Sequence, residues 1–496
     1  MVPVLLGIDL GTSSLKTILI EPDGRMLACA AREYAVDTPQ PGWAEQQPET
    51  WYQAAVDTIR QALEQSGTAA ERVAGIGLSG QMHGTVCLDA SGRPLRPAII
   101  WADQRSVAQV DTIKRQIGPE QLGAWTANPL ATGFMLATWL WLREHEPQTY
   151  RAARQLLLPK DYLRFRLTGE LGSEPSDASS TLMFDTARRC WSTALLEALD
   201  IDPAVLPAIH ESADIAGGLA AGFAAASGLP AGIPVVFGGS DQALQAIGNG
   251  LVSPGMLSST IGTGGQLFAP LLNPTYDPAL RLHCFCHALP ALWHLEAGML
   301  AAGLALKWMR DNLFASASYQ LLSDEASEVP PGAEGLLFAP YLAGERTPHM
   351  DPHATGSFVG LTLRHRRAHL VRAAMEGVVM ALRQGLELML DLGASAGRVV
   401  ASGGATRHPL WLQLQADVFA RPIHRTRTTE AAALGAAALA GVGVELYPDV
   451  HAACARLVCW DDQVIQPLAA HVETYERIFP TFCAMYPTLR ELRAPA

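Results

Sequence analysis

The stretch LLGIDLGTSSLKTILIEPDG, residues 5–24, places one carboxylate and a small polar turn between two apolar runs. The apolar runs at residues 4–10 and 15–20 are typical of buried strands, and residues 11–14 supply the turn between them. Pro22-Asp23-Gly24 predicts a second turn that leads into a third strand at residues 25–31. The stretch therefore predicts a β-meander with Asp9 and several hydroxyl groups at the tip of its first hairpin.

The second half of the chain repeats this pattern. The stretch GMLSSTIGTGGQLF, residues 255–268, predicts another hairpin, and its tip at residues 262–265 echoes the tip at residues 11–14. With 496 residues the chain is too long for one hydrophobic core. We therefore expect two related α/β domains, residues 1–243 and 244–496, each presenting a Gly-Thr hairpin to a shared cleft.

The hairpin tips have the composition of a phosphate site. Glycine allows a tight turn, and successive N–H groups in such a turn form a concavity that binds anions. A single tip of this kind is usually only a turn, but a pair on duplicated halves favours a nucleotide polyphosphate. The expected phosphate contacts are Gly11, Thr12, Ser13, Lys16, Gly262, Thr263 and Gly264. A carboxylate repels phosphate, so Asp9 is expected to hold Mg²⁺ beside it.

The composition excludes several classes of partner. The formal net charge of −12 argues against nucleic acid and against an anionic membrane surface. No apolar run reaches the roughly 18 to 20 residues that span a bilayer, and no signal peptide precedes the first strand. The sequence therefore predicts a cytoplasmic protein whose partners are small metabolites.

The cysteines do not suggest a metal centre. Eight of them are scattered along the chain, and the one cluster is HCFCH at residues 283–287. In a strand, alternate side chains point to opposite faces, so Cys284 and Cys286 are separated from both histidines. We interpret the cluster as a buried strand with reduced thiols.

Gly75 to Gly80 match the dinucleotide fingerprint G-x-G-x-x-G. An oxidoreductase that binds NAD would need this motif between a strand and a helix. Here the glycines lie in or just after a predicted strand, and the residues that follow lead into another strand. The NAD hypothesis therefore lacks its structural context, and no Walker A motif is present.

Further elements follow from hydrophobic periodicity and from proline and glycine positions. Strands are predicted at residues 72–78, 85–88 and 398–402. Helices are predicted from Pro48 and at residues 134–144, 162–168, 297–313, 367–392, 409–419 and 429–439. Residues 238–241, Gly-Gly-Ser-Asp, join a strand to a helix. Asp241 can serve there as an N-cap or as a carboxylate that reaches the cleft.

Six ordered motifs carry a family resemblance: GIDLGTSS, SGQMHG, LLPKDYLRFRLTGE, GGSDQA, YLAGERTPH and ASGGATRHPLWLQLQADVF. They cover some 400 residues, and the chain resembles the FGGY carbohydrate kinases. The resemblance implies an α/β fold of two duplicated actin-like, ribonuclease-H-like domains, the ASKHA superfold, around a central catalytic cleft. Sugar is expected mainly on the first domain and Mg·ATP mainly on the second.

The resemblance also implies individual roles. Asp241 matches the catalytic base, and with Asp9 it is expected to hold the metal. The matching sugar contacts are Met82, His83, Asp103, Asp241 and Gln242. The remaining nucleotide contacts are Gly303, Lys307, Gly403, Gly404, Ala405 and His408. We interpret Glu345 and Arg346 as a structural ion pair within a loop.

The expected activity is ATP-dependent phosphorylation of D-xylulose at its 5-hydroxyl, because the motifs are most similar to the branch of the family that acts on this ketopentose. Ala102 departs from the Asn usual in that branch. A kinase for ribulose, another ketose or a polyol is the nearest alternative. An actin-like ATPase that switches a protein-binding surface is the alternative from another class. Family resemblance also suggests a homodimer.

Overall fold

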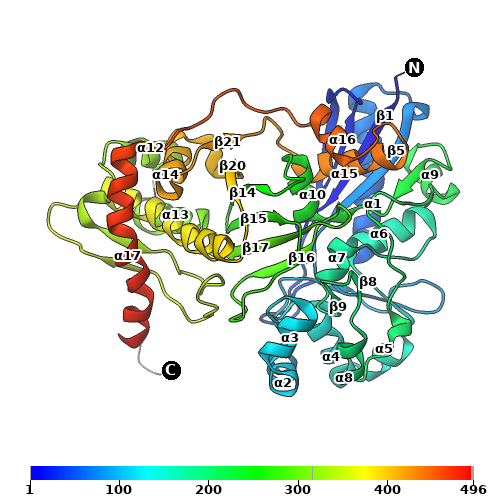
Figure 1. The fold of residues 1–496 in the computed structure, drawn as a ribbon. Coiled ribbons are helices and arrows are strands. Elements are labelled where there is room, and N and C mark those ends of the chain that lie inside the picture. Colours follow the sequence, from blue (N-terminus) through cyan, green and yellow to red (C-terminus); the bar gives the residue numbers. More distant parts are fainter. Residues whose placement is uncertain (1, 316, 493–496) are drawn as a thin grey trace.

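The computed structural model describes residues 2–315 and 317–492, which form two α/β lobes (Figure 1). Each lobe is built on one mixed sheet. The first sheet has the order β11-β12-β5-β1-β2-β3, and β13 also pairs with β5. Its strands are β1 (Val4–Leu10), β2 (Ser14–Ile20), β3 (Met26–Glu33), β5 (Val73–Gly80), β11 (Ile215–Gly218), β12 (Pro234–Val236) and β13 (Gly239–Ser240).

The second sheet has the order β16-β17-β15-β14-β20-β21. Its strands are β14 (Gly255–Ile261), β15 (Gly265–Leu271), β16 (His283–Cys286), β17 (Trp293–Met299), β20 (Ala396–Ser402) and β21 (Ile423–Arg425). In both sheets the first strand pairs antiparallel with the next strand of the chain and parallel with a later one: β1 with β2 and β5, β14 with β15 and β20. This shared topology confirms two duplicated α/β domains.

Helices cover the first sheet and build a region below it. They are α1 (Pro48–Ser66), α2 (Val107–Ile117), α3 (Pro119–Thr126), α4 (Met135–His145), α5 (Pro147–Ala152), α6 (Pro159–Thr168), α7 (Pro175–Ser179), α8 (Thr193–Ala198), α9 (Ala221–Ser227) and α10 (Asp241–Gly248). Helix α1 begins at Pro48 because proline suits a first helical turn. It buries Trp51, Ala55 and Ile59, and Gly67 ends it in the left-handed region with φ +60°. The predicted first helix is confirmed.

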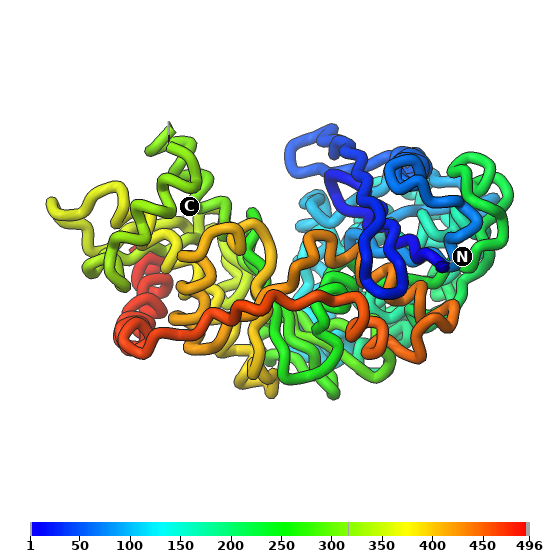
Figure 2. Tube along the Cα trace, turned by 90° about the horizontal axis from the view of Figure 1, so that it is seen from above, coloured from blue at the N-terminus to red at the C-terminus, as the bar shows by residue number. Residues whose placement is uncertain are grey.

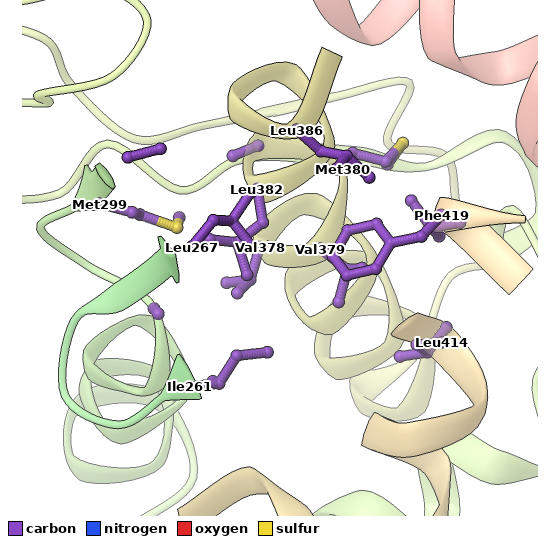
Figure 3. Close-up of a cluster of buried hydrophobic side chains, with 14 of the residues drawn as sticks. Ile261, Leu267, Met299, Val378, Val379, Met380, Leu382, Leu386, Leu414 and Phe419 are labelled. Carbon is purple, nitrogen blue, oxygen red and sulfur yellow. The ribbon is translucent and has the colours of Figure 1, made fainter. Parts of the chain in front are cut away.

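The second lobe has a large apolar core between its sheet and long helices. The helices are α11 (Gly303–Leu313), α12 (Tyr319–Ser327), α13 (Arg367–Asp391), α14 (Pro409–Phe419) and α17 (Ala469–Leu492). Figure 3 shows Leu267 and Met299 of the sheet facing Val378 and Leu382 of α13. This core fixes the strands that carry the second hairpin tip.

The remaining strands are short and lie outside the two sheets. They are β4 (Glu45–Gln46), β6 (Val86–Leu88), β7 (Ala98–Ile99), β8 (Gln155–Leu157), β9 (Phe184–Asp185), β10 (Cys190–Trp191), β18 (Leu337–Ala339) and β19 (Ser357–Val359). Within residues 2–315 and 317–492, no helix has the length and apolarity to span a bilayer.

Late in the sequence the chain returns to the first lobe. Helices α15 (Ala431–Gly443) and α16 (Val450–Leu457) join the core beneath β1 and α10, and residues 458–468 then run back to α17 in the second lobe (Figure 2). A Cβ on Gly7 or Gly77 would lie 2.0 or 1.9 Å from a carbonyl oxygen of α15. Glycines of the G-x-G-x-x-G motif thus serve close packing of a helix on the sheet. The boundary at residue 243 falls inside α10 and stays a prediction.

The helix predicted at residues 297–313 begins later than expected. Residues Ala297 to Met299 belong to β17, which pairs with β15 over its whole length, and the helix starts at Gly303. The run of small apolar residues here fits a helix as well as a buried strand, so periodicity alone misplaced the start. The hydrogen bonds to β15 make residues 297–299 a strand.

Candidate active site

The two hairpin tips present the same set of free donors. Gly11 N–H donates to Ser14 O over 3.0 Å, and Gly262 N–H donates to Gly264 O over 2.9 Å. Among the described residues, the N–H groups of Thr12 and Ser13 find no acceptor, and neither do those of Thr263 and Gly264. Adjacent free N–H groups in a turn bind anions. The two hairpin tips therefore have free N–H groups that could bind phosphate, as the sequence predicts.

Asp9 and Asp241 lie on either side of the end of β5. Asp9 stands opposite Ser79 in the β1–β5 ladder, and Ser240 stands opposite Gly80 in the β13–β5 ladder. Asp241 follows directly as the first residue of α10. The close approach requires glycine at 238, where φ is +80° and a Cβ would lie 2.1 Å from Leu78 O. The strand order thus brings the carboxylates of Asp9 and Asp241, which are far apart in sequence, to the same end of β5.

The environment of both carboxylates favours their neutral forms. Burial raises the pKa of Asp9 above its usual value of 3.8. Burial, followed by the charges of Asp9 and Glu296, raises the pKa of Asp241 to about 8. Oδ1 of each residue is buried without a hydrogen-bond partner among the described residues. Hard cations prefer carboxylate oxygens, so this pair fits a Mg²⁺ ion that would compensate its charge.

A buried ion network holds the segment that carries Asp241. Lys160 Nζ lies 2.9 Å from Asp161, 3.2 Å from Glu174 and 3.5 Å from Asp177. The same amine donates to Phe237 O over 3.2 Å, just before the Gly-Gly turn. Because the network contacts this backbone directly, it restricts the position of Asp241.

A second contact anchors the far side of the turn. Ser240 N–H donates to Ser176 Oγ of α7 over 3.0 Å. The segment that leads into α10 is therefore held at both ends by buried groups. These contacts fix the backbone position of Asp241.

His83 carries a buried, neutral imidazole. Its Nδ1 lies 2.9 Å from Ser180 O, and because a carbonyl can only accept, Nδ1 carries the hydrogen. Burial lowers the pKa of His83 to about 4. Nε2 is then a lone-pair acceptor. The ring packs 3.9 Å from the ring of Phe134, and the backbone has φ +69°, a strained value typical of functional positions.

The other expected sugar contacts are placed differently. Met82 is buried beside His83, and Gln242 follows Asp241 in α10. Asp103 is 1% exposed, and both of its oxygens accept hydrogen bonds from Arg105, with Ala44 N–H as a further donor. The Asp103 carboxylate is therefore already saturated. We assign it a structural role and leave it out of the site proposed below.

A cavity of about 430 Å³ lies behind the second hairpin tip. Seven predicted nucleotide residues line it: Gly262, Thr263, Gly303, Lys307, Gly404, Ala405 and His408. The residues that the sequence analysis missed are Ile261, Leu304, Leu306, Tyr319, Gln320, Ser323, Arg407 and Trp411. Helix α12, which contributes Tyr319, Gln320 and Ser323, was not predicted from the sequence, although Ser318 caps its first turn. The apolar and aromatic side chains that line the cavity fit a nucleotide base and ribose.

Two glycines shape this cavity. A Cβ on Gly303 would lie 2.4 Å from Gly262 O, and a Cβ on Gly403 would lie 2.6 Å from Ile261 O. Gly303 N–H in fact donates to Gly262 O over 2.9 Å. The start of α11 and the second hairpin tip can therefore come this close only if residue 303 has no side chain. Gly264 and Gly403 support the cavity without lining it.

Several predicted charges are already paired. Lys16 forms an ion pair of 2.6 Å with Glu430, which precedes α15, and Lys307 pairs with Asp311. Thr12 Oγ1 accepts from Trp101 Nε1 over 2.8 Å, a link that the sequence analysis did not anticipate. Both lysines would have to exchange these partners for phosphate.

The HCFCH cluster forms the expected buried strand. Cys284 and Cys286 join the core of the second lobe, whereas the ring of His283 stacks on Phe134 at 5.7 Å. In the part of the chain that the structure describes, no group of His, Cys, Asp and Glu has the arrangement of a protein-only metal site.

The predicted ion pair between Glu345 and Arg346 is wrong. Glu345 Oε1 accepts hydrogen bonds from the backbone N–H groups of Leu300 and Arg346, at 3.1 and 2.7 Å. The two side chains, both described by the structure, form no ion pair within 4.0 Å.

The duplicated domains, the paired phosphate turns and the convergent carboxylates define an actin-like phosphotransferase. Comparison with known proteins agrees. Residues 4–248 match the model of the N-terminal domain of the FGGY family of carbohydrate kinases, and residues 257–444 match its C-terminal domain. The chain belongs to the FGGY family of carbohydrate kinases and is a sugar kinase.

Similar proteins extend over nearly the whole chain. A xylulose kinase of Bacillus subtilis strain 168 is 35% identical over 488 residues, which cover 98% of this chain and 97% of that protein. A xylulose kinase of Escherichia coli K12 is 37% identical and covers 96% of this chain and 98% of its own. The crystal structure of a xylulose kinase from Rhodospirillum rubrum superimposes with a TM-score of 0.93 at 32% identity, covering 99% of each chain.

Proposed function

We propose that this sugar kinase transfers the γ-phosphoryl group of Mg·ATP to the 5-hydroxyl of D-xylulose. The observation that carries the proposal is Asp241, the first residue of α10, whose buried Oδ1 has no hydrogen-bond partner among the described residues. The substrate rests on the xylulose kinases of Bacillus subtilis and Escherichia coli, which are 35% and 37% identical.

In the proposed reaction, Asp241 accepts the proton of the 5-hydroxyl as the sugar oxygen attacks the γ-phosphorus and ADP leaves. Phosphoryl transfer depends mainly on positioning and charge stabilisation. Thr12, Ser13, Thr263 and Gly264 supply N–H donors for the phosphate oxygens. When bound, Mg²⁺ supplies positive charge to the phosphates, and Asp9 and Asp241 are the residues that would hold it.

His83 orients the sugar in this scheme. Its Nε2 accepts a hydrogen bond from a sugar hydroxyl, while Ser180 O fixes the ring from the other side. The adenosine part of ATP occupies the cavity lined by Gly404, Ala405 and Trp411. Closure of the lobes would exclude water, which otherwise competes as phosphoryl acceptor.

The test is ADP release from Mg·ATP with D-xylulose, L-xylulose, D-ribulose, L-ribulose and glycerol in parallel, with Asp241→Ala as control. Strong release with D-xylulose that is lost in the variant supports the proposal. Strong release with another acceptor instead would move the substrate and point to the residues around Trp101 and Ala102. Release that is independent of sugar and survives Asp241→Ala would contradict it.

A further inference from the structure

The loop that contains Arg346 is fixed to the end of β17. Thr347 N–H donates to Gly298 O over 3.0 Å, and Thr347 Oγ1 donates to Arg281 O over 2.8 Å. On its other side, Glu345 Oε1 accepts from Leu300 N–H over 3.1 Å. The backbone around Arg346 is therefore held by contacts on both sides, which determines where its side chain can lie.

The Arg346 side chain passes over β17 at Gly298. A Cβ built on Gly298 would be 3.7 Å from Arg346 Cδ, so glycine leaves room for the arginine stem. Glu296 and Gly298 are the partly exposed residues in this otherwise buried strand, and they alternate with buried neighbours. They therefore share the face over which the arginine passes.

The Arg346 guanidinium has no hydrogen-bond partner among the described residues, although the charges of Glu296 and Glu345 act on it. Among the residues that the structure describes, it makes no hydrogen bond and no ion pair within 4.0 Å, although it is largely withdrawn from solvent. Glu296 Oε2 is also buried without a hydrogen-bond partner among these residues, although His294 Nε2 lies 4.0 Å from it and Gln266 interacts with the carboxyl group. Burying polar groups unsatisfied is costly, and an arginine left without acceptors is unusual. Buried polar groups without hydrogen-bond partners are typical of a site that binds a ligand.

The groups around Arg346 identify the space that it faces. Glu296 stands opposite His283 in the β16–β17 ladder, so the two side chains share one face of the sheet. The charge of Arg346 contributes, after burial, to lowering the pKa of His83 and of His283. The Phe134 ring links these histidines, at 3.9 Å from His83 and 5.7 Å from His283. On the other side, the charge of Glu296 contributes to the raised pKa of Asp241. Arg346 and Glu296 thus lie on the face of the sheet that carries His283, next to the Phe134 and His83 rings.

We propose that Arg346 and Glu296 bind the sugar from the second lobe, with Arg346 donating to the ketone oxygen of the open-chain ketose and Glu296 accepting from a hydroxyl. The inference rests on the proposed function and extends it to the choice between ketose and polyol. His83 Nε2 and the ionised Glu296 carboxylate are acceptors, so a ketone oxygen, which can only accept, needs the donor that Arg346 supplies.

The charge pattern favours the sugar over the γ-phosphate as the partner of Arg346. A carboxylate beside the guanidinium would repel a phosphate oxygen but accept readily from a hydroxyl. The cavity for the nucleotide is lined by other residues, including Lys307, Arg407 and His408. The γ-phosphate is nevertheless the alternative that the experiment must separate.

The test compares Arg346→Met and Arg346→Gln with wild type in three steady-state measurements. These are KM for D-xylulose, KM for ATP, and the competitive inhibition constant Ki of xylitol, the polyol without the carbonyl. Loss of a charge-assisted hydrogen bond should raise KM for D-xylulose roughly tenfold to hundredfold in Arg346→Met. KM for ATP and Ki for xylitol should stay within about threefold of wild type, since neither ligand uses the ketone contact.

The other variants sharpen the result. Arg346→Gln retains N–H donors and should recover part of the affinity for D-xylulose, and Glu296→Gln should weaken the sugar without changing KM for ATP. Arg383→Met is the matched control, because Arg383 is a mostly buried arginine that pairs with Glu387 and Glu476 in the same lobe. Its kinetic constants should equal those of wild type.

Three outcomes would overturn the inference. A rise in KM for ATP with an unchanged KM for D-xylulose would assign Arg346 to the phosphoryl group. Equal losses for D-xylulose and xylitol would reduce it to a structural residue, as would unchanged constants in every variant. Failure of the proposed function is recognised separately, because wild type would then show no sugar-dependent ADP release; if wild type prefers another ketose, the measurements are made with that ketose and its polyol.

Discussion

Replacing Asp241 by Asn should stabilise the folded protein, and the gain should increase with pH. Burial raises the pKa of Asp241 from its ordinary 3.8 to about 8, with the charges of Asp9 and Glu296 as lesser causes. A carboxyl whose pKa is raised by folding binds more protons in the folded state than in the unfolded state. Its contribution to stability is full below the unfolded pKa and is lost as pH rises toward the folded pKa.

The size of the effect follows from the pKa difference. Each pKa unit corresponds to about 1.36 kcal/mol. Because Asn never ionises, Asp241→Asn should gain up to about 1.7 kcal/mol of stability at about pH 5 and up to about 4 kcal/mol at about pH 7. For a domain of roughly 150 to 250 residues, each kcal/mol shifts Tm by about 2 to 4 °C.

The assay is calorimetric unfolding of wild type and Asp241→Asn across this pH range, with EDTA and without nucleotide. The Tm difference should be a few degrees at the acidic end and at least about 8 °C near neutrality. The exposed Asp462→Asn is the control and should show a small, constant difference. A Tm difference for Asp241→Asn that does not change with pH would refute the reasoning, because Asp241 would then be ionised in the folded protein throughout.

Three further predictions follow from the same geometry. Lys160→Met leaves the carboxylates of the buried network without their cation, so we expect a loss of about 3 to 5 kcal/mol of stability together with a lower kcat, measured by denaturant unfolding and initial rates. Unchanged stability would show that the network is not needed. Gly303→Ala puts a Cβ 2.4 Å from Gly262 O and should raise KM for ATP with little effect on KM for sugar; equal affinity for ATP would contradict this cavity. Asp9→Asn should raise the Mg²⁺ concentration needed for half-maximal rate, and an unchanged Mg²⁺ titration would remove Asp9 from the metal site.

Local sequence patterns predicted the parts of the site that short segments define. Both hairpin tips and the start of α10 at Asp241 are where turn residues and apolar runs indicate. These features depend on neighbouring residues, which a single sequence displays directly. The residues 297–302 show the limit, since only pairing with the distant β15 makes part of that segment a strand.

Features made by distant segments could not be predicted in the same way. The packing of α15 on Gly7 and Gly77 depends on a return of the chain after more than 350 residues. The failure of the Glu345–Arg346 ion pair has the same origin, because the backbone N–H of Leu300 captures the carboxylate. The hydrogen bonds from Arg105 that occupy the Asp103 carboxylate likewise appear only in the fold.

The most direct test of the account is the fate of the γ-phosphoryl group, followed by phosphorus NMR with purified protein, Mg·ATP and D-xylulose. The account predicts that ADP and a sugar phosphate form in equal amounts, with the phosphate on the C5 oxygen, and that Asp241→Asn forms neither. ADP and inorganic phosphate formed at the same rate without sugar would contradict it and would favour an actin-like ATPase.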